Sequence, residues 1–110
     1  LAAILFSRKV AKVIIVSRIK QDHNNVTYKV KGQLFFVSKI YFLQGFDIYE
    51  HPENITINLS EANIWDQSGV IALDQIIRKF KNGGSKVEII GLNDESLNLF
   101  ERLGGIESSH

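Results

Sequence analysis

The sequence predicts an α/β domain in which a mixed β-sheet is flanked by helices, in the order β-β-α-β-α-β-α. Short segments of alternating or continuous apolar residues, typical of strands, come between segments whose apolar residues recur every three or four positions, typical of helices. The 110 residues contain no repeat, low-complexity stretch or long linker. One domain with a single hydrophobic core is therefore expected.

A β-hairpin opens the predicted domain. Its strands cover residues 12–20 and 26–36, and the polar cluster 21–25 forms the turn between them. The first strand is rich in β-branched residues, and the second begins with apolar and polar residues in alternation. Gly32 interrupts the second strand and predicts a bulge or a bend. The alternating apolar residues are Val26, Tyr28 and Val30.

The first helix is predicted from Lys39 toward Glu50, with Ser38 as its cap and Pro52 as its stop. Its apolar face would consist of Ile40, Leu43 and Phe46.

The third strand, 54–60, alternates strictly, and the helix that begins near Ser68 has the clearest apolar stripe. Glycines at 83–84 end that helix. An interior strand is predicted over 87–90, and Asn93 or Asp94 caps the last helix. The core residues expected on these elements are Ile55, Ile57, Leu59, Val70, Leu73, Ile76, Ile77, Phe80, Leu97, Phe100 and Leu103, with Gly104 closing the last helix.

The two ends of the chain differ in character from the predicted domain, which covers residues 12–105. Residues 106–110 are predicted to be a frayed tail. Residues 1–11 are interpreted as the end of a membrane-proximal linker, because the apolar run 1–6 precedes basic residues, as at the cytoplasmic end of a membrane span. Six residues are too few to cross a bilayer, which takes about 20. An amphipathic turn that covers the domain's own core is the alternative.

Composition and motifs argue against several classes of function. The formal net charge of +1 gives no case for a nucleic-acid partner, and the absence of cysteine removes thiolate metal sites and disulfides. The histidines, His23, His51 and His110, lie far apart and match no metal-binding spacing. No catalytic motif or phosphate-binding glycine loop is present. We therefore expect a domain that is not an enzyme and holds no cofactor or metal.

The candidate functional site is the junction Glu61–Gly69, between the third strand and the best helix. The positive end of the helix dipole would favour an anion there, or a regulatory phosphate on Ser68. Capping of the helix by Asp66 or Ser68 is the structural alternative. Trp65 is either a hot spot for a partner or an aromatic residue packed beneath the loop. The predicted interaction loop consists of Trp65, Asp66, Gln67, Ser68 and Gly69.

Over residues 12–105 the sequence resembles the STAS family, named for sulfate transporters and anti-sigma-factor antagonists. The segment Asn58–Ser60, followed by Asp66–Val70, is similar to the family's strand, loop and Asp-x-Ser-Gly helix start. Gly32–Phe36 is similar to the Gly-x-Leu-Phe-Phe pattern typical of the transporter branch, and Lys86–Leu92 to the family's last strand.

The resemblance implies a regulatory domain on the cytoplasmic side of the plasma membrane, within a sulfate permease-type anion transporter. Its implied partners are the transmembrane domain of the parent transporter and a cytoplasmic regulatory protein. The alternative is a soluble anti-sigma-factor antagonist, in which a kinase would phosphorylate the residue at the position of Ser68. Gln67 and the pair Val70-Ile71 depart from the antagonist pattern. An enzymatic role would need a site that no motif indicates.

Overall fold

The computed structural model describes residues 13–105, so the predicted linker and tail lie outside the described residues. The predicted element order is confirmed. The elements are β1 (Ile14–Lys20), β2 (Asn25–Leu34), α2 (Lys39–Gln44), β3 (Asn54–Ile64), α3 (Gln67–Asn82), β4 (Lys86–Ile90), α4 (Asp94–Phe100) and the π-helical turn η1 (Glu101–Gly105).

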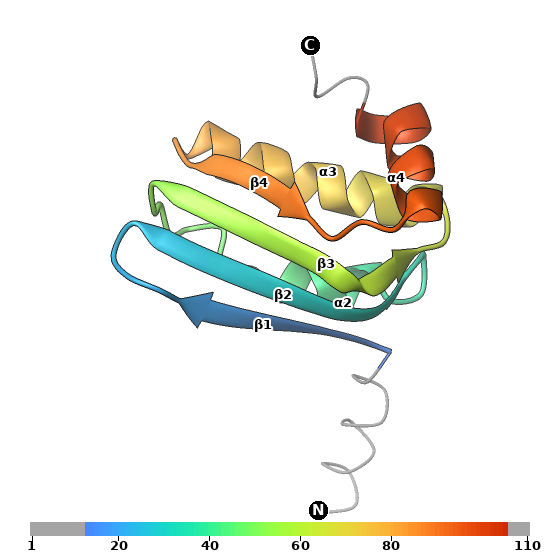
Figure 1. Cartoon of the computed structure of the whole chain (residues 1–110), viewed down its shortest axis with the longest axis horizontal. Helices are drawn as coiled ribbons and strands as arrows, with labels where there is room; N and C mark the ends of the chain where they lie inside the picture. The colour runs from blue at the N-terminus through green and yellow to red at the C-terminus, as the bar shows by residue number, and fades with distance from the viewer. Residues whose placement is uncertain (1–12, 106–110) are drawn as a thin grey trace, which may run out of the picture.

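The strands form one mixed sheet in the order β1-β2-β3-β4 (Figure 1). β1 and β2 pair antiparallel, which confirms the hairpin, and β2–β3 and β3–β4 pair parallel. The prediction that 87–90 is an interior strand is wrong. β4 lies at the edge of the sheet, where its alternating residues are half-buried and Ile90 is exposed.

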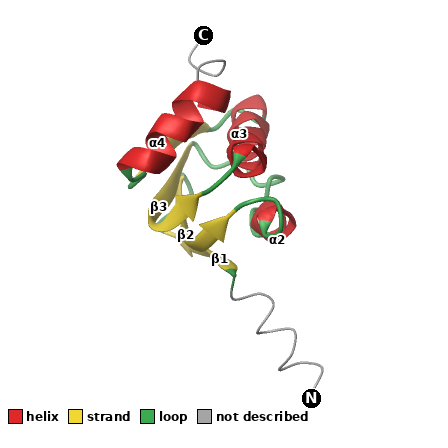
Figure 2. Cartoon of the chain, turned by 90° about the vertical axis from the view of Figure 1, so that its right-hand side faces the viewer, coloured by secondary structure: helices red, strands yellow, loops and turns green. Residues whose placement is uncertain are grey.

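Helices α2 and α3 pack on one face of the sheet, and α4 lies beside α3 (Figure 2). The core forms between this face and the helices, because the apolar residues of β2 and β3 point to it on alternate positions. Tyr28, Phe42, Phe46 and Phe80 fill its aromatic centre through successive ring contacts. The predicted core of α3 is confirmed in full.

The first helix is shorter than predicted, and of its predicted apolar face Leu43 and Phe46 contact the core but Ile40 does not. It ends at Gln44, and Gly45 then packs so closely against the Val16 side chain that a Cβ there would clash. Ile40 is 55% exposed, whereas Phe42 is fully buried. Ser38 occupies the cap position, but its hydroxyl donates to the Gln33 carbonyl instead of capping the helix.

The third strand is longer than predicted, because the alternation changes phase within it. The pairing of β2 with β3 shifts register after Lys29, which pairs with Asn58, so that Lys31 pairs with Glu61. Beyond this bulge Ala62 and Ile64 are buried in place of the expected alternate positions. Residues 61–64 of the predicted junction are therefore strand.

The prediction of the last helix is only partly confirmed. Of the two predicted caps, Asn93 is the one that caps α4. Its side chain accepts a hydrogen bond from the Ser96 backbone N–H at 2.7 Å. Phe100 packs partly against the core, but Leu97 and Leu103 are exposed. Gly104 does not end a regular helix, since it lies in the π-helical turn.

Candidate functional site

The five residues of the predicted interaction loop lie together at the carboxyl end of β3. Trp65 and Asp66 link β3 to α3, and Gln67, Ser68 and Gly69 form the first turn of that helix. The carboxyl end of the parallel strand β2 lies at the same end of the sheet (Figure 1). The segment between β2 and α2 is therefore the neighbour of the loop.

Asp66 holds the loop in place through both carboxylate oxygens. Oδ1 accepts a hydrogen bond from the Gly69 backbone N–H at 2.9 Å, which makes Asp66, and not Ser68, the helix cap. Oδ2 accepts from the Phe36 backbone N–H at 3.0 Å. The second bond joins the start of α3 to the segment before α2, residues that are 30 positions apart in the sequence.

The loop is also fixed by direct backbone contact with the end of β2. The Trp65 N–H donates to the Leu34 carbonyl at 3.0 Å. Gly69 is buried, and a Cβ at this position would lie 2.7 Å from the same carbonyl oxygen. The close approach therefore requires a residue without a side chain at Gly69.

Trp65 does not pack beneath the loop, because 61% of its surface is exposed. The centroid of its ring lies 5.2 Å from that of the Phe35 ring, and the centroids of the Phe35 and Phe36 rings are 5.9 Å apart. Phe36 is itself 65% exposed. We call these three residues the aromatic patch. Val37 and Ile40, which follow it toward α2, are exposed apolar residues as well.

Phe35 and Phe36 are the members of the aromatic patch that were not predicted from the sequence as functional residues. Their signal was the run of apolar residues 34–37, which is too long for a half-buried strand with strict alternation. Clustered exposed aromatic side chains are typical of surfaces that bind another protein.

Ser68 is half-buried in the first turn of α3, a helix of 16 residues. Negative charge on this residue would lie near the positive end of the helix dipole but also next to the carboxylate of Asp66. Phosphorylation of Ser68 stays a prediction.

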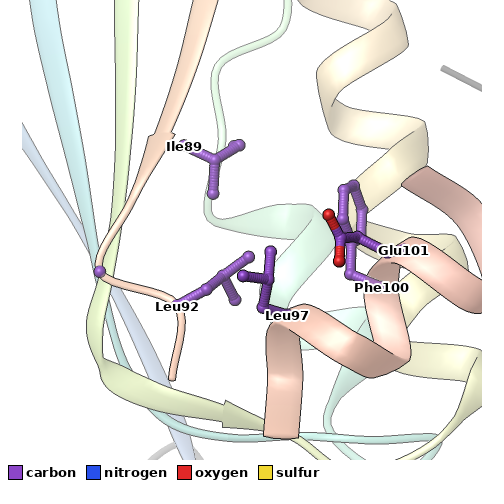
Figure 3. Close-up of a pocket in the computed structure, with 6 residues that line it drawn as sticks. Ile89, Leu92, Leu97, Phe100 and Glu101 are labelled. Atoms are coloured by element: carbon purple, nitrogen blue, oxygen red, sulfur yellow. The ribbon is translucent and has the colours of Figure 1, made fainter. Parts of the chain in front are cut away.

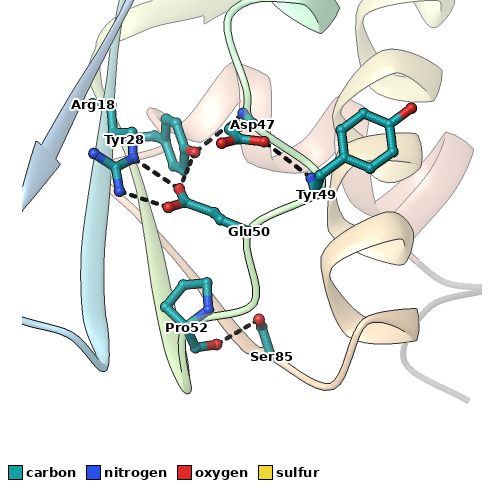
Figure 4. Close-up of polar contacts among 7 residues, drawn as sticks. All are labelled: Arg18, Tyr28, Asp47, Tyr49, Glu50, Pro52 and Ser85. Atoms are coloured by element: carbon teal, nitrogen blue, oxygen red, sulfur yellow. Dashed lines mark hydrogen bonds and ion pairs between the residues drawn. The ribbon is translucent and has the colours of Figure 1, made fainter.

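A polar network at the opposite end of the helical face was not predicted (Figure 4). Arg18 on β1 donates two hydrogen bonds, of 2.8 and 2.6 Å, to the carboxylate of Glu50. The Tyr28 hydroxyl donates to Glu50 at 2.5 Å and accepts from the Asp47 backbone N–H at 3.2 Å. Asp47 and Glu50 follow α2 in the chain, so the prediction that they lie on a helix is wrong.

Charges and burial in this network shift the acidity of its members. The Arg18 guanidinium lowers the pKa of Glu50 below its ordinary value. Burial raises the pKa of Tyr28 to about 12, and the hydrogen bond to Glu50 acts in the same direction. The pKa of Arg18 is raised by its hydrogen bonds to Glu50. The groups satisfy one another, so the network fits a structural role that ties β1 to the segment after α2.

A cavity of about 380 Å³ lies between the end of β4 and α4 (Figure 3). Apolar side chains line most of it, and Glu101 is the ionisable group on its wall. The lining residues are Ile89, Gly91, Leu92, Leu97, Phe100 and Glu101. This arrangement offers no pair of groups for acid–base or nucleophilic chemistry.

Within residues 13–105, no three histidine, cysteine, aspartate or glutamate side chains come close enough together to hold a metal ion. No helix of this part of the chain is both long and apolar enough to cross a membrane.

Comparison with known proteins gives consistent matches. The family model for the STAS domain matches residues 16–109. The protein named "Putative sulfate transporter YbaR" of Bacillus subtilis (strain 168) is 42% identical over 103 residues, which cover 94% of this chain and 21% of YbaR. The chain thus spans about a fifth of the curated relative that it matches.

Solved structures of two kinds share the fold. The STAS domain of an antisigma-factor antagonist from Rhodobacter sphaeroides is 38% identical, with a TM-score of 0.68 over 72% of this chain and 87% of that one. SLC26A9, whose murine form is an anion transporter, is 13% identical, with a TM-score of 0.72 over 97% of this chain and 23% of that one. The mixed sheet, the helices on its face and these matches lead to one assignment: the chain belongs to the STAS family.

Proposed function

We propose that this STAS domain is a non-catalytic regulatory module of a sulfate-type anion transporter and works on the cytoplasmic side of the plasma membrane. The observation that carries the proposal is the 42% identity to YbaR, which extends over 94% of the chain. The chain corresponds to only 21% of that relative. A module of this size would act on the remainder of the transporter rather than carry the anion itself.

The contact surface in this proposal is the Trp65–Gly69 loop together with the aromatic patch. Asp66 fixes the loop and the segment before α2 in one arrangement. Trp65 and Phe36 are therefore exposed to solvent on a backbone that is already ordered. A partner would gain apolar contacts there at little cost in conformational entropy. The transmembrane domain of the parent transporter is the proposed partner, and a cytoplasmic regulatory protein would compete for the same surface.

The proposal is tested by locating the natural full-length protein. An antibody raised against residues 13–105 is used on fractionated cells of the source organism. We expect the antigen in the membrane fraction, resistant to extraction with alkaline carbonate, and in a polypeptide several times longer than 110 residues. Recovery of a short polypeptide from the soluble fraction would contradict the proposal.

A second candidate function is that of a soluble anti-sigma-factor antagonist switched by phosphorylation of Ser68. It is supported by the 38% identity to the Rhodobacter sphaeroides domain, of which this chain covers 87%. Ser68 lies half-buried in the first turn of α3, so part of its surface is open to a kinase, as this function requires. In that case the soluble polypeptide would be a kinase substrate. Ser68→Ala would abolish its phosphorylation, whereas Ser60→Ala, at an exposed serine of β3, would not.

A further inference from the structure

The cavity between the end of β4 and α4 is separate from the contact surface proposed above. None of the residues that line it belongs to the Trp65–Gly69 loop or to the aromatic patch. One side of its lining comes from β4 and the segment after it, and the other from α4 and the first residue of η1 (Figure 3). The cavity is therefore a second candidate site of this domain.

Polar contacts fix the start of α4 against β3 and so keep the cavity open. The buried Ser96 hydroxyl accepts a hydrogen bond from the Ile64 backbone N–H at 3.0 Å. The Asn93 side-chain amide donates to the Asn63 side-chain oxygen at 2.5 Å. A shift of α4 onto the end of β4 would fill the cavity but would break these bonds, one of which is buried.

Gly91 fixes the opposite wall. Its φ is +83°, and a Cβ at this position would lie 2.5 Å from the Ser60 backbone nitrogen. Only a residue without a side chain fits so close to β3 in this conformation. The chain therefore turns directly after β4, and Leu92 reaches the cavity together with Ile89.

The lining combines apolar side chains with one carboxylate. The volume of about 380 Å³ is more than twice the roughly 150 Å³ of an apolar cavity that holds benzene. Within residues 13–105, the carboxylate of Glu101 forms no hydrogen bond or ion pair. It is therefore available to a positively charged group of a ligand.

The charges near the cavity also favour a cation. Residues 94–105 contain three carboxylates and one cationic side chain, although the whole chain has a formal net charge of +1. The carboxylates are Asp94, Glu95 and Glu101, and the cation is Arg102. An anion would be repelled here, whereas an ammonium group would be attracted to Glu101.

We propose that this cavity binds a small organic ammonium ion with an apolar body. The hydrocarbon part lies against Leu92, Leu97 and Phe100, where it replaces water, and the ammonium group pairs with Glu101. The ligand contacts both α4 and the end of β4, so its binding stabilises the folded chain. This inference goes beyond the proposed function, because it requires neither a transporter nor the contact surface at Trp65.

Three probes of similar shape and different charge test the proposal: 3-phenylpropylammonium, 3-phenylpropan-1-ol and 3-phenylpropionate. Each is titrated into the 110-residue chain, and the amide resonances of Gly91 and Leu97 are followed by NMR. We expect saturable shifts, with the ammonium probe binding about fivefold more tightly than the alcohol and the carboxylate probe binding most weakly. Equal affinity for the ammonium and carboxylate probes, or no saturable shift with any probe, would overturn the inference.

Glu101→Gln separates the charge from the apolar cavity. It should weaken the ammonium probe by about fivefold and leave the alcohol unchanged. The matched control is Glu95→Gln, which removes an exposed carboxylate of α4 that does not line the cavity and should bind like the unmodified chain. Equal weakening by both variants would show a general effect of negative charge and contradict a site at Glu101.

Leu97→Asn tests the apolar part of the site. Leu97 is 39% exposed, so the variant should stay folded, as its amide spectrum checks. It should weaken the ammonium and the alcohol probes alike, and unchanged binding of both would place them outside this cavity. None of these results depends on where the full-length protein resides, so this inference and the proposed function fail separately.

Discussion

Polar and apolar side chains are arranged in opposite ways at the two ends of the sheet. Where β2 and β3 begin, Glu50 satisfies Arg18 and Tyr28, and the Ser85 hydroxyl donates to the Pro52 carbonyl at 2.6 Å (Figure 4). Where these strands end, Asp66 bonds only to backbone groups, and aromatic side chains face outward. At the first end, which we call the buried end, the polar groups bond to one another and tie segments of the fold together. The second, which we call the exposed end, presents a rigid apolar surface.

This difference teaches that burial and exposure of aromatic residues have separate causes in this domain. Tyr28 is buried because its hydroxyl finds two partners inside the network. Trp65 is exposed although a neighbouring ring contacts it, because the Asp66 bonds set the direction of the loop. Changes at the first end should therefore alter stability, and changes at the second should alter binding.

The largest effect is expected at the buried end. Tyr28→Ala removes a fully buried ring that contacts Phe46 and Phe80, and should lower the free energy of unfolding by about 3–5 kcal/mol. Tyr28→Phe, which removes only the hydroxyl, should cost about 1–2 kcal/mol. Urea unfolding followed by circular dichroism measures both. Equal losses in the two variants would show that the ring contacts contribute nothing.

Asp66→Ala should cost about 2 kcal/mol, because the variant loses the helix cap and the bond to the Phe36 N–H. The control is Asp94→Ala, in the first turn of α4, where the exposed carboxylate is not the cap. That control should cost about 0.5 kcal/mol. The amide of Phe36 should also exchange with solvent faster in Asp66→Ala alone. Unchanged exchange would mean that Asp66 does not join the two segments.

The ion pair at the buried end should make stability depend on pH. The pKa of Glu50 is lower in the folded chain than its ordinary value of 4.5. Its contribution is therefore present above that value and is lost as the pH falls through the folded pKa. In Glu50→Gln this loss on acidification should be smaller, as measured by unfolding midpoints at pH 7 and pH 3. If the unmodified chain and Glu50→Gln lost equal stability on acidification, Glu50 would be excluded as the source of that loss.

Tyr28 should make stability depend on pH in the alkaline range, where stability falls as the pH rises. Because its pKa is raised from 10 to about 12, the folded chain favours the protonated hydroxyl. The corresponding stability is complete below pH 10 and is lost as the pH rises toward 12. Tyr28→Phe should be less sensitive than the unmodified chain over this interval, and an identical decline would contradict the assignment.

At the exposed end, Ser68→Asp should change stability by less than about 1 kcal/mol, because helix dipole and Asp66 act on it in opposite directions. The same variant should weaken partner binding by placing fixed charge in the contact surface. Titration calorimetry with the purified partner measures this, and equal affinity of both forms would count against the loop as the contact.

The sequence predicted most where one local pattern determines one element. The stripe Val70–Phe80 and the Asp66 and Asn93 caps depend on residues within a turn or two of one another, so helices α3 and α4 began as expected. β3 was cut short because the bulge reverses which residues face the core, and only pairing with β2 shows this. Phe42 in place of Ile40 likewise follows from where α2 meets the sheet.

For the candidate site, the position of the loop could be predicted, but its surface could not. Trp65–Gly69 follows directly from a strand and a helix start. The aromatic patch combines this loop with Phe35 and Phe36, from the end of another strand. The network of Arg18, Tyr28 and Glu50 joins residues up to 32 positions apart, which no local pattern reports.

The most direct test of the central claim compares two exposed aromatic residues in the full-length natural protein. Trp65→Ala alters the surface at the carboxyl end of β3, and Tyr49→Ala, at a residue that is 84% exposed in the segment before β3, is the matched control. Under the proposed transporter function, sulfate uptake is measured in cells with equal amounts of each variant in the membrane. The account predicts that Trp65→Ala lowers uptake by about tenfold, as for loss of a hot-spot contact, while Tyr49→Ala transports like the unmodified protein. Equal uptake by both variants would contradict a regulatory contact at this surface.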